Sequence, residues 1–400
     1  MLTREILGAA RAIEPEIVAL RRAIHAEPEL GLHTPKTSEK VRAALADLPL
    51  EWREGPSTTG MVATLKGEAG PGRRVLLRGD MDALPMPEET GLDFASKIAG
   101  AMHACGHDAH TAMLAGAARL LCDRRSSLAG EVQFMFQPGE EGWHGARFML
   151  DDGLIDPLPD AAFALHIMPN APHGVIAGRE GPLLASADQL EIVVEGSGGH
   201  ASLPHETRDP VPVAAEIVLA LQAMVTRQFS VHDPVVVTVA SVSAGSAHNV
   251  IPDRAVLKGT MRSLSPASRA RLREAVELLA VGIAGAHGLT ARVTVLEGFP
   301  VTICAGAAVD FGERVSRDML GETGFQRLAD PIMGAEDFAY VLEKVPGAMF
   351  FLGVAPQGDN WASCCGIHST RMMIDEGAMP IGSALLAALG ERFLAEGFAA

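Results

Sequence analysis

Apolar strand patterns alternate with amphipathic helix patterns at both ends of the chain, and this alternation limits the folds that it can adopt. Short apolar runs bounded by turn residues predict strands at 61–66, 74–79, 131–136, 161–167 and 348–353. Helical spacing of apolar residues predicts helices at 110–122, 306–320 and 378–395. Strands that alternate with helices favour a largely parallel sheet with helices packed on its faces. We therefore expect an α/β fold for this part of the chain.

The middle of the chain follows a different order of elements. The predicted order is strand, helix, strand, strand, helix, strand, at 188–194, 211–227, 235–242, 254–262, 266–285 and 291–298. This order is typical of a small α+β domain of the split βαβ type. Because the α/β pattern resumes after Pro300, and because 400 residues exceed one average domain, we predict two domains. The larger consists of two segments, 1–185 and 299–400, and the smaller, residues 186–298, is inserted between them.

Composition argues against several classes of function. The 49 acidic residues outnumber the 33 lysines and arginines and give a formal charge of -16, which would repel the phosphates of a nucleic acid. No run approaches the roughly 20 apolar residues of a membrane-spanning helix, and the N-terminus lacks the apolar core of a secretory signal. Five scattered cysteines do not suggest a disulfide framework. We therefore expect a cytoplasmic protein that acts on small molecules and binds neither nucleic acid nor membrane.

The strongest local signal is the segment 102–110, which holds three histidines, one cysteine and one aspartate. Thiolate and imidazole are good ligands for zinc, cobalt and nickel. Cys105 and His107 are two residues apart, so their side chains would point the same way in an extended chain. The alternative interpretation is a polar loop that caps the next helix, with its histidines merely exposed.

Two acidic motifs follow predicted strands. Glu140 and Glu141 come after the strand at 131–136, where one carboxylate could bind a metal and the other could serve as general base. Asp80 and Asp82 follow the strand at 74–79, and an aspartate here could bind a metal or orient a histidine ligand. Each motif alone could also be an ordinary acidic turn exposed to solvent, because aspartate favours turns in any case.

Two single histidines complete the set of candidate ligands. His166 lies inside an apolar run and His368 lies near the end of the chain. The alternatives are a hydrogen-bonded core histidine for the first and an exposed loop histidine for the second. We rank the remaining cysteines as bystanders: Cys122, Cys304, Cys364 and Cys365.

These signals gain weight from their common position near the ends of predicted strands, where open α/β sheets place their binding sites. Glu140 remains as a base if the other candidates bind metal. Two divalent ions about 3.5–4 Å apart that share one water could stabilise the oxyanion of a hydrolytic reaction. A nucleotide-binding protein is disfavoured, because the chain has no G-x-G-x-x-G motif after its first strands and no P-loop. The five candidate ligands are Cys105, His107, Glu141, His166 and His368.

Several motifs in a fixed order make the chain similar to a known family over nearly its whole length. They are HAEPEL at 25–30, GDMDALP, MHACGHDAHTA, QPGEEG, the strand of His166, GGHASLPH, NVIPD, GTMR, GAEDF and the final IHS. The chain resembles the metallopeptidase family that includes aminoacylases and glutamate-releasing zinc carboxypeptidases. More closely, it resembles the amidohydrolase branch of that family: hippurate hydrolases, N-acyl-amino-acid amidohydrolases and plant auxin-conjugate hydrolases.

The resemblance implies that the two-segment domain is catalytic and that the five candidate ligands bind two divalent ions, with manganese, zinc, cobalt or nickel as candidates. It implies that Glu140 activates the attacking water and later protonates the leaving amine. Asp82 matches the aspartate of the broader family pattern. The broader family carries a histidine ligand where this chain has Asp80, a difference that is usual in this branch.

For the inserted domain, the resemblance implies a lid that also carries the dimer contact. His200 matches a lid histidine that, in relatives, reaches the active site across a dimer interface and polarises the scissile carbonyl. Asn249 and Arg262 match polar residues that hold the carbonyl or carboxylate group of the substrate. A homodimer or a dimer-based homo-oligomer is therefore expected. Glu336 and Asp337 match an acidic pair near the site, to which we assign no role.

The activity that the resemblance implies is hydrolysis of the amide bond of small N-acyl amino acids, such as hippurate-like or N-acetyl compounds. A dipeptidase or an N-carbamoyl-amino-acid hydrolase on the same scaffold is the alternative, because the catalytic motifs hardly distinguish between these substrates. A metal-loaded binding or regulatory protein without turnover is disfavoured, since Glu140 and all five ligands are present.

Overall fold

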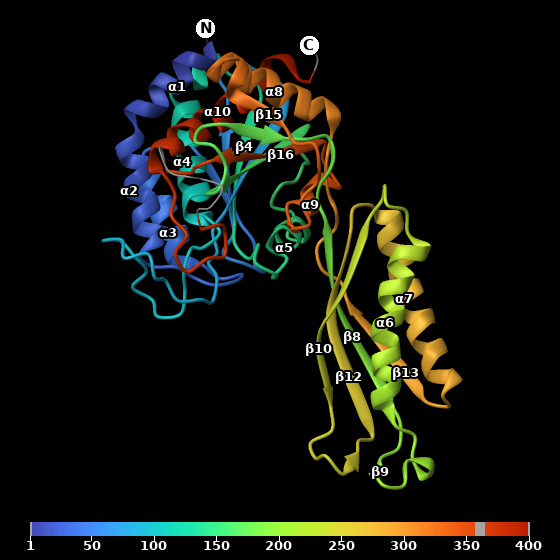
Figure 1. Cartoon of the computed structure of the whole chain (residues 1–400). Helices are drawn as coiled ribbons and strands as arrows, with labels where there is room; N and C mark the ends of the chain where they lie inside the picture. The colour runs from blue at the N-terminus through green and yellow to red at the C-terminus, as the bar shows by residue number, and fades with distance from the viewer. Residues whose placement is uncertain (1, 357–364, 399–400) are drawn as a thin grey trace. The chain divides into compact units, whose positions relative to one another are not determined.

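The computed structural model describes residues 2–356 and 365–398, and the chain divides into two compact units. Unit 1 comprises 1–183, 303–330 and 337–400, and unit 2 comprises 184–302 and 331–336 (Figure 1). Backbone hydrogen bonds join the short segment 331–336 to the rest of unit 2. The amide of Ala185 donates to the carbonyl oxygens of Ile332 and Gly334 at 3.2 and 2.8 Å. The sequence pattern did not assign this segment to the inserted domain.

Unit 1 is built on an eight-stranded mixed sheet with the strand order β1-β2-β4-β3-β5-β16-β6-β15. β3 pairs in parallel with β4 and β5, and β5 pairs in parallel with β16, whereas β2 is antiparallel to β1 and β4. The prediction of an α/β fold with a largely parallel sheet is therefore confirmed. The strands are β1 (Glu51–Glu54), β2 (Met61–Lys66), β3 (Arg74–Asp80), β4 (Glu131–Gln137), β5 (Ala161–Met168), β6 (Ile176–Gly178), β15 (Phe325–Arg327) and β16 (Gly347–Gly353).

The central strands of this sheet are buried along almost their whole length, which explains their continuous apolar sequences. Nearly every residue of β3, β4, β5 and β16 is buried, as expected for parallel strands that are covered by helices. α4 and α10 pack against each other and against β3, and α8 packs against β16. The helices of unit 1 are α1 (Leu2–Ala12), α2 (Glu14–His25), α3 (Pro35–Ala44), α4 (His107–Cys122), α5 (Gly145–Asp151), α8 (Gly306–Leu320), α9 (Ala339–Leu342) and α10 (Met379–Glu396).

Two helical segments contradict the expectation that no part of the chain is long and apolar enough to cross a membrane. Glu376–Glu396, which contains α10, and α6 (Pro210–Gln228) of unit 2 both meet this criterion by length and composition. For the α10 segment, 83% of the apolar window is buried inside the protein, as in a core helix that is apolar on all sides. For α6 the buried share is 33%, and its outer face exposes apolar side chains such as Leu219.

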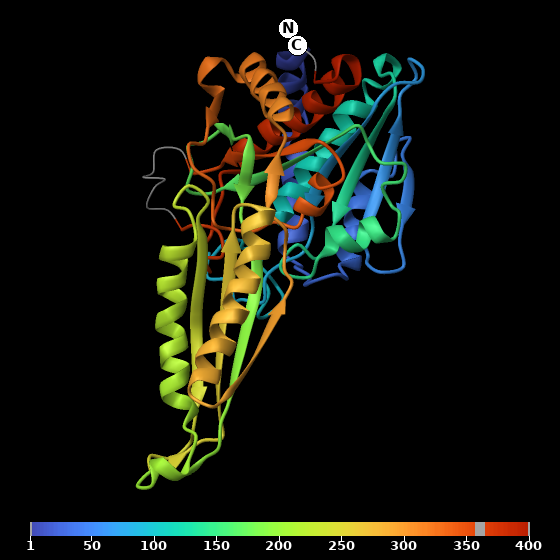
Figure 2. The same ribbon diagram turned by 90° about the vertical axis from the view of Figure 1, so that its right-hand side faces the viewer.

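Unit 2 is a four-stranded antiparallel sheet with two helices packed side by side on one face (Figure 2). The strand order is β10-β12-β8-β13. Asp209 and Ser265 cap the amino ends of α6 and α7 by accepting backbone hydrogen bonds. The chain order β8-α6-β10-β12-α7-β13 is the predicted split βαβ arrangement. The elements are β8 (Ser186–Glu195), β10 (Val235–Ala244), β12 (Arg254–Ser263), β13 (Thr290–Leu296) and α7 (Pro266–Ala286).

A second, two-stranded sheet lies at one end of unit 2 and was not predicted from the sequence. It consists of β9 (Gly199–His200) and β11 (Val250–Ile251), and it pairs His200 with Val250. The amide of Ala201 donates to the carbonyl oxygen of Asn249 at 3.0 Å. Two motifs that are distant in sequence, GGHAS and NVIP, are therefore side by side.

Candidate metal centre

The candidate site lies where β3, β4 and β5 end, because parallel neighbours bring their carboxyl ends to the same edge of a sheet. Asp82 follows β3 by two residues, and Glu140 and Glu141 lie just beyond β4. His166 lies near the end of β5. The register of the sheet thus brings motifs from three separate parts of the chain to one place.

The segment that carries Cys105 and His107 enters α4 through a sharp change of backbone direction. Gly106 has a left-handed φ of 88°, and α4 begins at His107 rather than near residue 110 as predicted. A Cβ atom at Gly106 would lie 2.4 Å from Cγ1 of Ile167, so the position requires glycine for space as well as for conformation. The expectation of an extended chain here is therefore wrong. A left-handed residue and the start of a helix, not strand-like alternation, set the directions of the two side chains.

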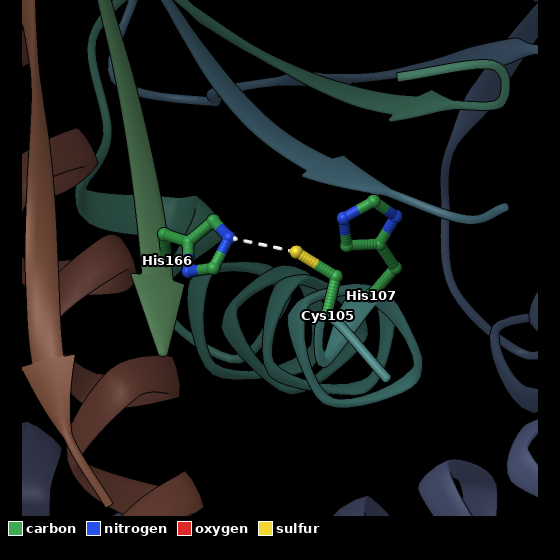
Figure 3. Close-up of side chains that lie close together, drawn as sticks. All are labelled: Cys105, His107 and His166. Carbon is green, nitrogen blue, oxygen red and sulfur yellow. Dashed lines mark hydrogen bonds between the residues drawn. The ribbon is translucent and has the colours of Figure 1, made fainter. Parts of the chain in front are cut away.

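The five predicted ligand side chains converge. Cys105, His107 and His166 offer ligand atoms within 4.8 Å of one another, and so do Cys105, Glu141 and His368. Cys105 Sγ lies 3.4 Å from His166 Nε2 (Figure 3), and His368 Nε2 lies 3.3 Å from Glu141 Oε1. Since Cys105 belongs to both groups, the two sets of donor atoms adjoin each other.

Several donor atoms in this cluster have no hydrogen-bond partner within residues 2–356 and 365–398. Both ring nitrogens of His107 are buried without one, and Oε1 of Glu141 is buried without a hydrogen bond although it lies at ion-pair distance from His368. Leaving buried polar atoms unpaired is unfavourable, so such atoms point to a ligand. A mixture of sulfur, nitrogen and oxygen donors suits zinc and similar divalent ions. The residues present therefore fit a pair of metal ions.

Hydrogen bonds determine which histidine nitrogens are available in the cluster. His166 Nδ1 donates to the carbonyl oxygen of Ile167 at 2.6 Å, which leaves Nε2 facing Cys105. Burial, with His110 nearby, holds the pKa of His166 well below its ordinary value, so the ring stays neutral. His110 has both nitrogens engaged, because Nε2 accepts from the amide of Ile167 at 2.8 Å and Nδ1 donates to Asp80 at 2.6 Å. His110 is therefore a structural residue.

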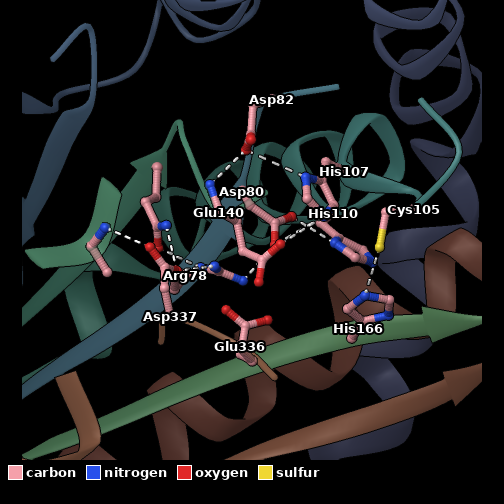
Figure 4. Close-up of polar contacts among 12 residues, drawn as sticks. Arg78, Asp80, Asp82, Cys105, His107, His110, Glu140, His166, Glu336 and Asp337 are labelled. Atoms are coloured by element: carbon pink, nitrogen blue, oxygen red, sulfur yellow. Dashed lines mark hydrogen bonds and ion pairs between the residues drawn. The ribbon is translucent and has the colours of Figure 1, made fainter. Parts of the chain in front are cut away.

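A buried arginine joins the ends of β3 and β4, and the sequence analysis did not identify it. Arg78 donates from Nε to Gln137 Oε1 at 2.8 Å and from Nη2 to Asp337 Oδ1 at 3.1 Å, and it forms an ion pair with Asp80 (Figure 4). Burial would raise the pKa of Asp80, but Arg78 and two nearby histidines outweigh it and hold this pKa well below its ordinary value. The sequence does contain a sign of this buried ion pair, because Arg78 lies within the largely apolar strand RVLLRG.

Asp82 fixes the backbone of the two glutamates. Its Oδ1 accepts from the amide of Glu140 at 2.9 Å, and its Oδ2 accepts from the amide of Glu141 at 3.0 Å. Oδ1 also lies 3.5 Å from Nδ1 of His107, a distance at which any hydrogen bond is weak. One carboxylate thus links the loop after β4 to the start of α4.

Comparisons with known proteins identify the family. Residues 76–392 match peptidase family M20/M25/M40. N-acetylcysteine deacetylase of Bacillus subtilis is 38% identical over 385 residues, which cover 95% of this chain and 97% of that protein. The chain belongs to peptidase family M20/M25/M40.

Two further members of the M20 family are similar over most of their length. Thermostable carboxypeptidase 1 of Saccharolobus solfataricus is 36% identical over 398 residues, which cover 98% of this chain and 99% of that protein. IAA-amino acid hydrolase ILR1-like 2 of Arabidopsis thaliana is 38% identical over 395 residues, which cover 96% of this chain and 88% of that protein.

A solved structure supports the same assignment. The Bacillus subtilis YXEP protein, described as a dinuclear metal binding peptidase from the M20 family, is 34% identical and superposes with a TM-score of 0.81 over 96% of this chain and 99% of that chain. The resemblance drawn from the motifs is confirmed, and this M20-family chain is a metal-dependent amide hydrolase.

The residues predicted on the inserted segment belong to unit 2 of this M20-family chain. His200 is exposed, and its Nδ1 lies 2.8 Å from Oγ of Ser202. Asn249 is exposed beside it, and Arg262 is half-buried, with Nη1 donating to the carbonyl oxygen of Met333 at 2.7 Å. The substrate contacts assigned to these three residues stay predictions.

The other residues that the sequence analysis left without a role fall into two groups. Glu336 and Asp337 are buried, and the amide of Ala146 and the side chain of Arg78 both donate to Asp337. Cys365 is a half-buried free thiol, and Cys364 lies outside the described residues.

We expect replacement of Asp82 by Asn to weaken metal binding, because the amide NH2 group would face one of the two backbone donors that Asp82 now accepts. A loss of affinity of about tenfold or more is expected for such a supporting residue. Titration of the metal-free protein with Zn²⁺ measures it. Asp160→Asn is the control: Asp160 is exposed, but it also accepts a backbone hydrogen bond, from Arg74 at 2.8 Å, and it lies just before β5, at the opposite end from His166. Equal affinities in both variants would contradict the role assigned to Asp82.

Proposed function

We propose that this M20-family member hydrolyses the amide bond of small N-acyl amino acids with two bound divalent ions. The observation that carries the proposal is the convergence of five ligand side chains from four separate segments of the chain, beside a sixth residue, the acidic Glu140. Glu140 shares a group with His107 and Glu141, in which the donor atoms lie within 4.8 Å of one another. The proposed ligands are Cys105, His107, Glu141, His166 and His368.

The adjacent glutamates both lie near His107, but Glu141 has a second set of neighbours, which supports separate roles. Oε2 of Glu140 lies 3.9 Å from Nε2 of His107, whereas Glu141 also lies with Cys105 and His368. When bound, the two ions would polarise the scissile carbonyl group and lower the pKa of the attacking water. In the proposed reaction Glu140 accepts a proton from that water as its oxygen bonds to the carbonyl carbon. Glu140 then gives the proton to the amide nitrogen as the C–N bond breaks, so that an acid and an amine leave.

The names of two relatives support an N-acyl amino acid as the substrate class. N-acetylcysteine deacetylase and IAA-amino acid hydrolase both act, by name, on an acyl group joined to an amino acid. A planar guanidinium can bind a carboxylate through two parallel hydrogen bonds, so we propose Arg262 and Asn249 as the residues that hold the amino acid end of the substrate.

A peptide substrate is the second candidate, because two similar proteins of Saccharolobus solfataricus are named thermostable carboxypeptidases. The bond that would be broken is an amide in both cases, so the metal cluster and Glu140 would act in the same way. The choice depends on the residues that contact the two ends of the substrate.

We expect Glu140→Gln to lower kcat by about 10²–10⁴-fold, the usual contribution of a general acid–base group, while the protein still binds two metal ions. Glu141→Gln should instead lower metal content, because it removes a proposed ligand charge at the neighbouring position. Metal analysis by mass spectrometry and single-turnover kinetics separate the two effects. Turnover close to wild type in Glu140→Gln would exclude this residue as the base.

A substrate panel tests the substrate class directly. Protein stripped with a chelator should be inactive and should regain activity with Mn²⁺, Co²⁺, Ni²⁺ or Zn²⁺. The reconstituted protein should then release amino acid from hippurate and N-acetyl amino acids faster than from dipeptides or N-carbamoyl amino acids, as measured by amine release. Higher kcat/KM for dipeptides would favour the second candidate.

A homodimer through unit 2 is also proposed, and β10 supports it. β10 is an edge strand of ten residues, and its side chains become exposed along most of its length, with Val236 and Val242 at 36% and 60%. An exposed apolar edge strand offers unpaired backbone groups to a second copy of the same strand. In such a dimer, we propose that the exposed His200 acts in the active site of the other subunit.

We expect Val236→Lys combined with Val242→Lys to halve the molar mass measured by sedimentation velocity, because paired lysines would repel each other across the interface. The turnover rate of this double variant should also fall, whereas its metal content should stay the same. Leu278→Lys and Val281→Lys, two exposed positions on α7 at 78% and 46%, form the control pair. A wild-type chain that sediments as a fully active monomer would rule out the dimer and the proposed action of His200.

A further inference from the structure

A cluster of charged residues, most of them buried, adjoins the proposed metal-binding segment and is not used by the proposed reaction. Its centre is Asp108, the residue after the proposed ligand His107. We call this group the Asp108 cluster. Asp108 accepts from Arg21 Nε at 2.7 Å and from His25 Nδ1 at 2.7 Å, and none of these three side chains is more than 2% exposed. The cluster comprises Arg21, Arg22, His25, Glu88, Asp108 and Glu376.

His25 is held between two carboxylates. Its Nε2 lies 3.1 Å from Oε1 of Glu88, so each ring nitrogen donates to an acidic group when the ring is protonated. Burial alone would lower the pKa of His25, but Asp108 and Glu88 outweigh it and raise this pKa to about 9. His25 is therefore a cation at neutral pH. Together with two arginines it balances the three carboxylates of the cluster, which a buried charge requires.

The cluster extends from Asp108 to the end of residues 368–375, which we call the His368 segment. Arg21 Nη1 donates to Glu376 Oε1 at 3.0 Å, and Arg22 Nε donates to both oxygens of Glu376 at 3.1 Å. Glu376 begins the short helix that follows the His368 segment. One guanidinium group, that of Arg21, thus joins the residue next to His107 to the end of the His368 segment.

A second connection is made by Glu89, the residue after the cluster member Glu88. The amide of Glu89 donates to the carbonyl oxygen of Thr370 at 2.7 Å, and Oγ1 of Thr370 donates to Glu89 Oε2 at 3.0 Å. Thr370 lies two residues beyond His368. The chain beyond His368 is therefore attached at two points: at Thr370 by Glu89, next to the cluster, and at Glu376 by the cluster itself.

His368 needs such support because its backbone is unfavourable. Its φ is 64°, in the left-handed region that non-glycine residues rarely adopt. The amide of His368 donates to the carbonyl oxygen of Ala104 at 2.7 Å, which places His368 next to Cys105. The side chain of His368 is also 51% exposed, so few neighbours hold it in place. If the attachments of this segment were weakened, its strained backbone would move to a more favourable conformation and carry the proposed ligand away.

We propose that the Asp108 cluster is a positioning device that holds the His368 segment against the metal-binding segment, so that Cys105, Glu141 and His368 keep the geometry of one ion site. Arg21, His25 and Glu376 are positioning residues in this proposal and touch no reacting atom. The inference rests on the proposed metal binding and assigns a purpose to the HAEPEL motif, whose first residue is His25.

Glu376→Gln tests the proposal, because it removes the charge that both arginines bind while keeping the size of the side chain. We expect about tenfold faster release of one of the two metal ions to a chelator, in line with the effect of other residues that support metal ligands. Release of the second ion should be unchanged. The absorption bands of the Co²⁺-substituted protein should also shift, because they report the geometry around the Cys105 thiolate.

Glu391→Gln is the matched control. Glu391 forms a comparable ion pair, with Arg124 Nε at 2.8 Å, on a part of α10 remote in sequence from His368, and its side chain is 9% exposed against 15% for Glu376. Both variants should lose similar stability in urea, but only Glu376→Gln should change metal release and the cobalt spectrum. Equal release rates in the two variants would overturn the proposal.

Arg21→Lys provides a second test that retains the charge. A lysine ammonium group cannot bind Asp108 and Glu376 with the fixed fork of a guanidinium group, so the faster release of one ion should persist in a folded protein. Metal release like that of the wild type in both Arg21→Lys and Glu376→Gln would exclude positioning by the cluster. A wild-type protein that binds no metal would instead refute the proposed function itself, and the metal content of the wild type separates these two outcomes.

Discussion

The parallel pairing of β3 with β4 and β5 is the constraint on which the metal centre depends. Parallel neighbours end at the same edge of the sheet, so the segments after these strands meet there although they are far apart in the sequence. Arg78 and Asp80 alternate with buried apolar residues along β3, and a shift of one residue would move both to the opposite face of the sheet. Asp82 then connects the segments by accepting the amides of Glu140 and Glu141.

Two groups of charged residues lie near this site. Arg78, Asp80 and Asp337 form a buried group, and the Asp108 cluster, in which Arg22 is exposed, forms the other. Removing charges from water is costly, and replacing such pairs by apolar residues is often neutral or stabilising. These charged groups therefore contribute more to the positions of the surrounding segments than to the stability of the protein, because hydrogen bonds between charged groups allow few arrangements. Both groups contact segments that carry proposed ligands, which agrees with a positioning function.

The fold class followed from local patterns. Strands such as β3 and β5 are apolar throughout because they are buried, and the split βαβ order of unit 2 was visible in its alternating periods. That the ligand motifs lie close together could be predicted from their positions after strands and from the family resemblance. One expectation from the sequence was wrong: the segment Glu376–Glu396, which contains α10, does satisfy the length and hydropathy of a membrane span, although most of it is buried as in a core helix.

What the sequence did not predict depends on contacts between distant residues. The partners of Arg78 are set by strand register and by Asp337, which follows much later in the chain. The pairing of β9 with β11 is two residues long and has no periodicity to detect. The left-handed turn at Gly106 is local, but the lack of space for a Cβ atom there is caused by Ile167 on β5, which is distant in sequence.

That turn has a consequence for how such proteins can diverge. His107 is the first residue of α4, and each residue added ahead of it would rotate the imidazole by about 100° around the helix axis, since a turn holds 3.6 residues. The number of residues between Cys105 and His107 therefore cannot change without moving the imidazole away from the thiolate.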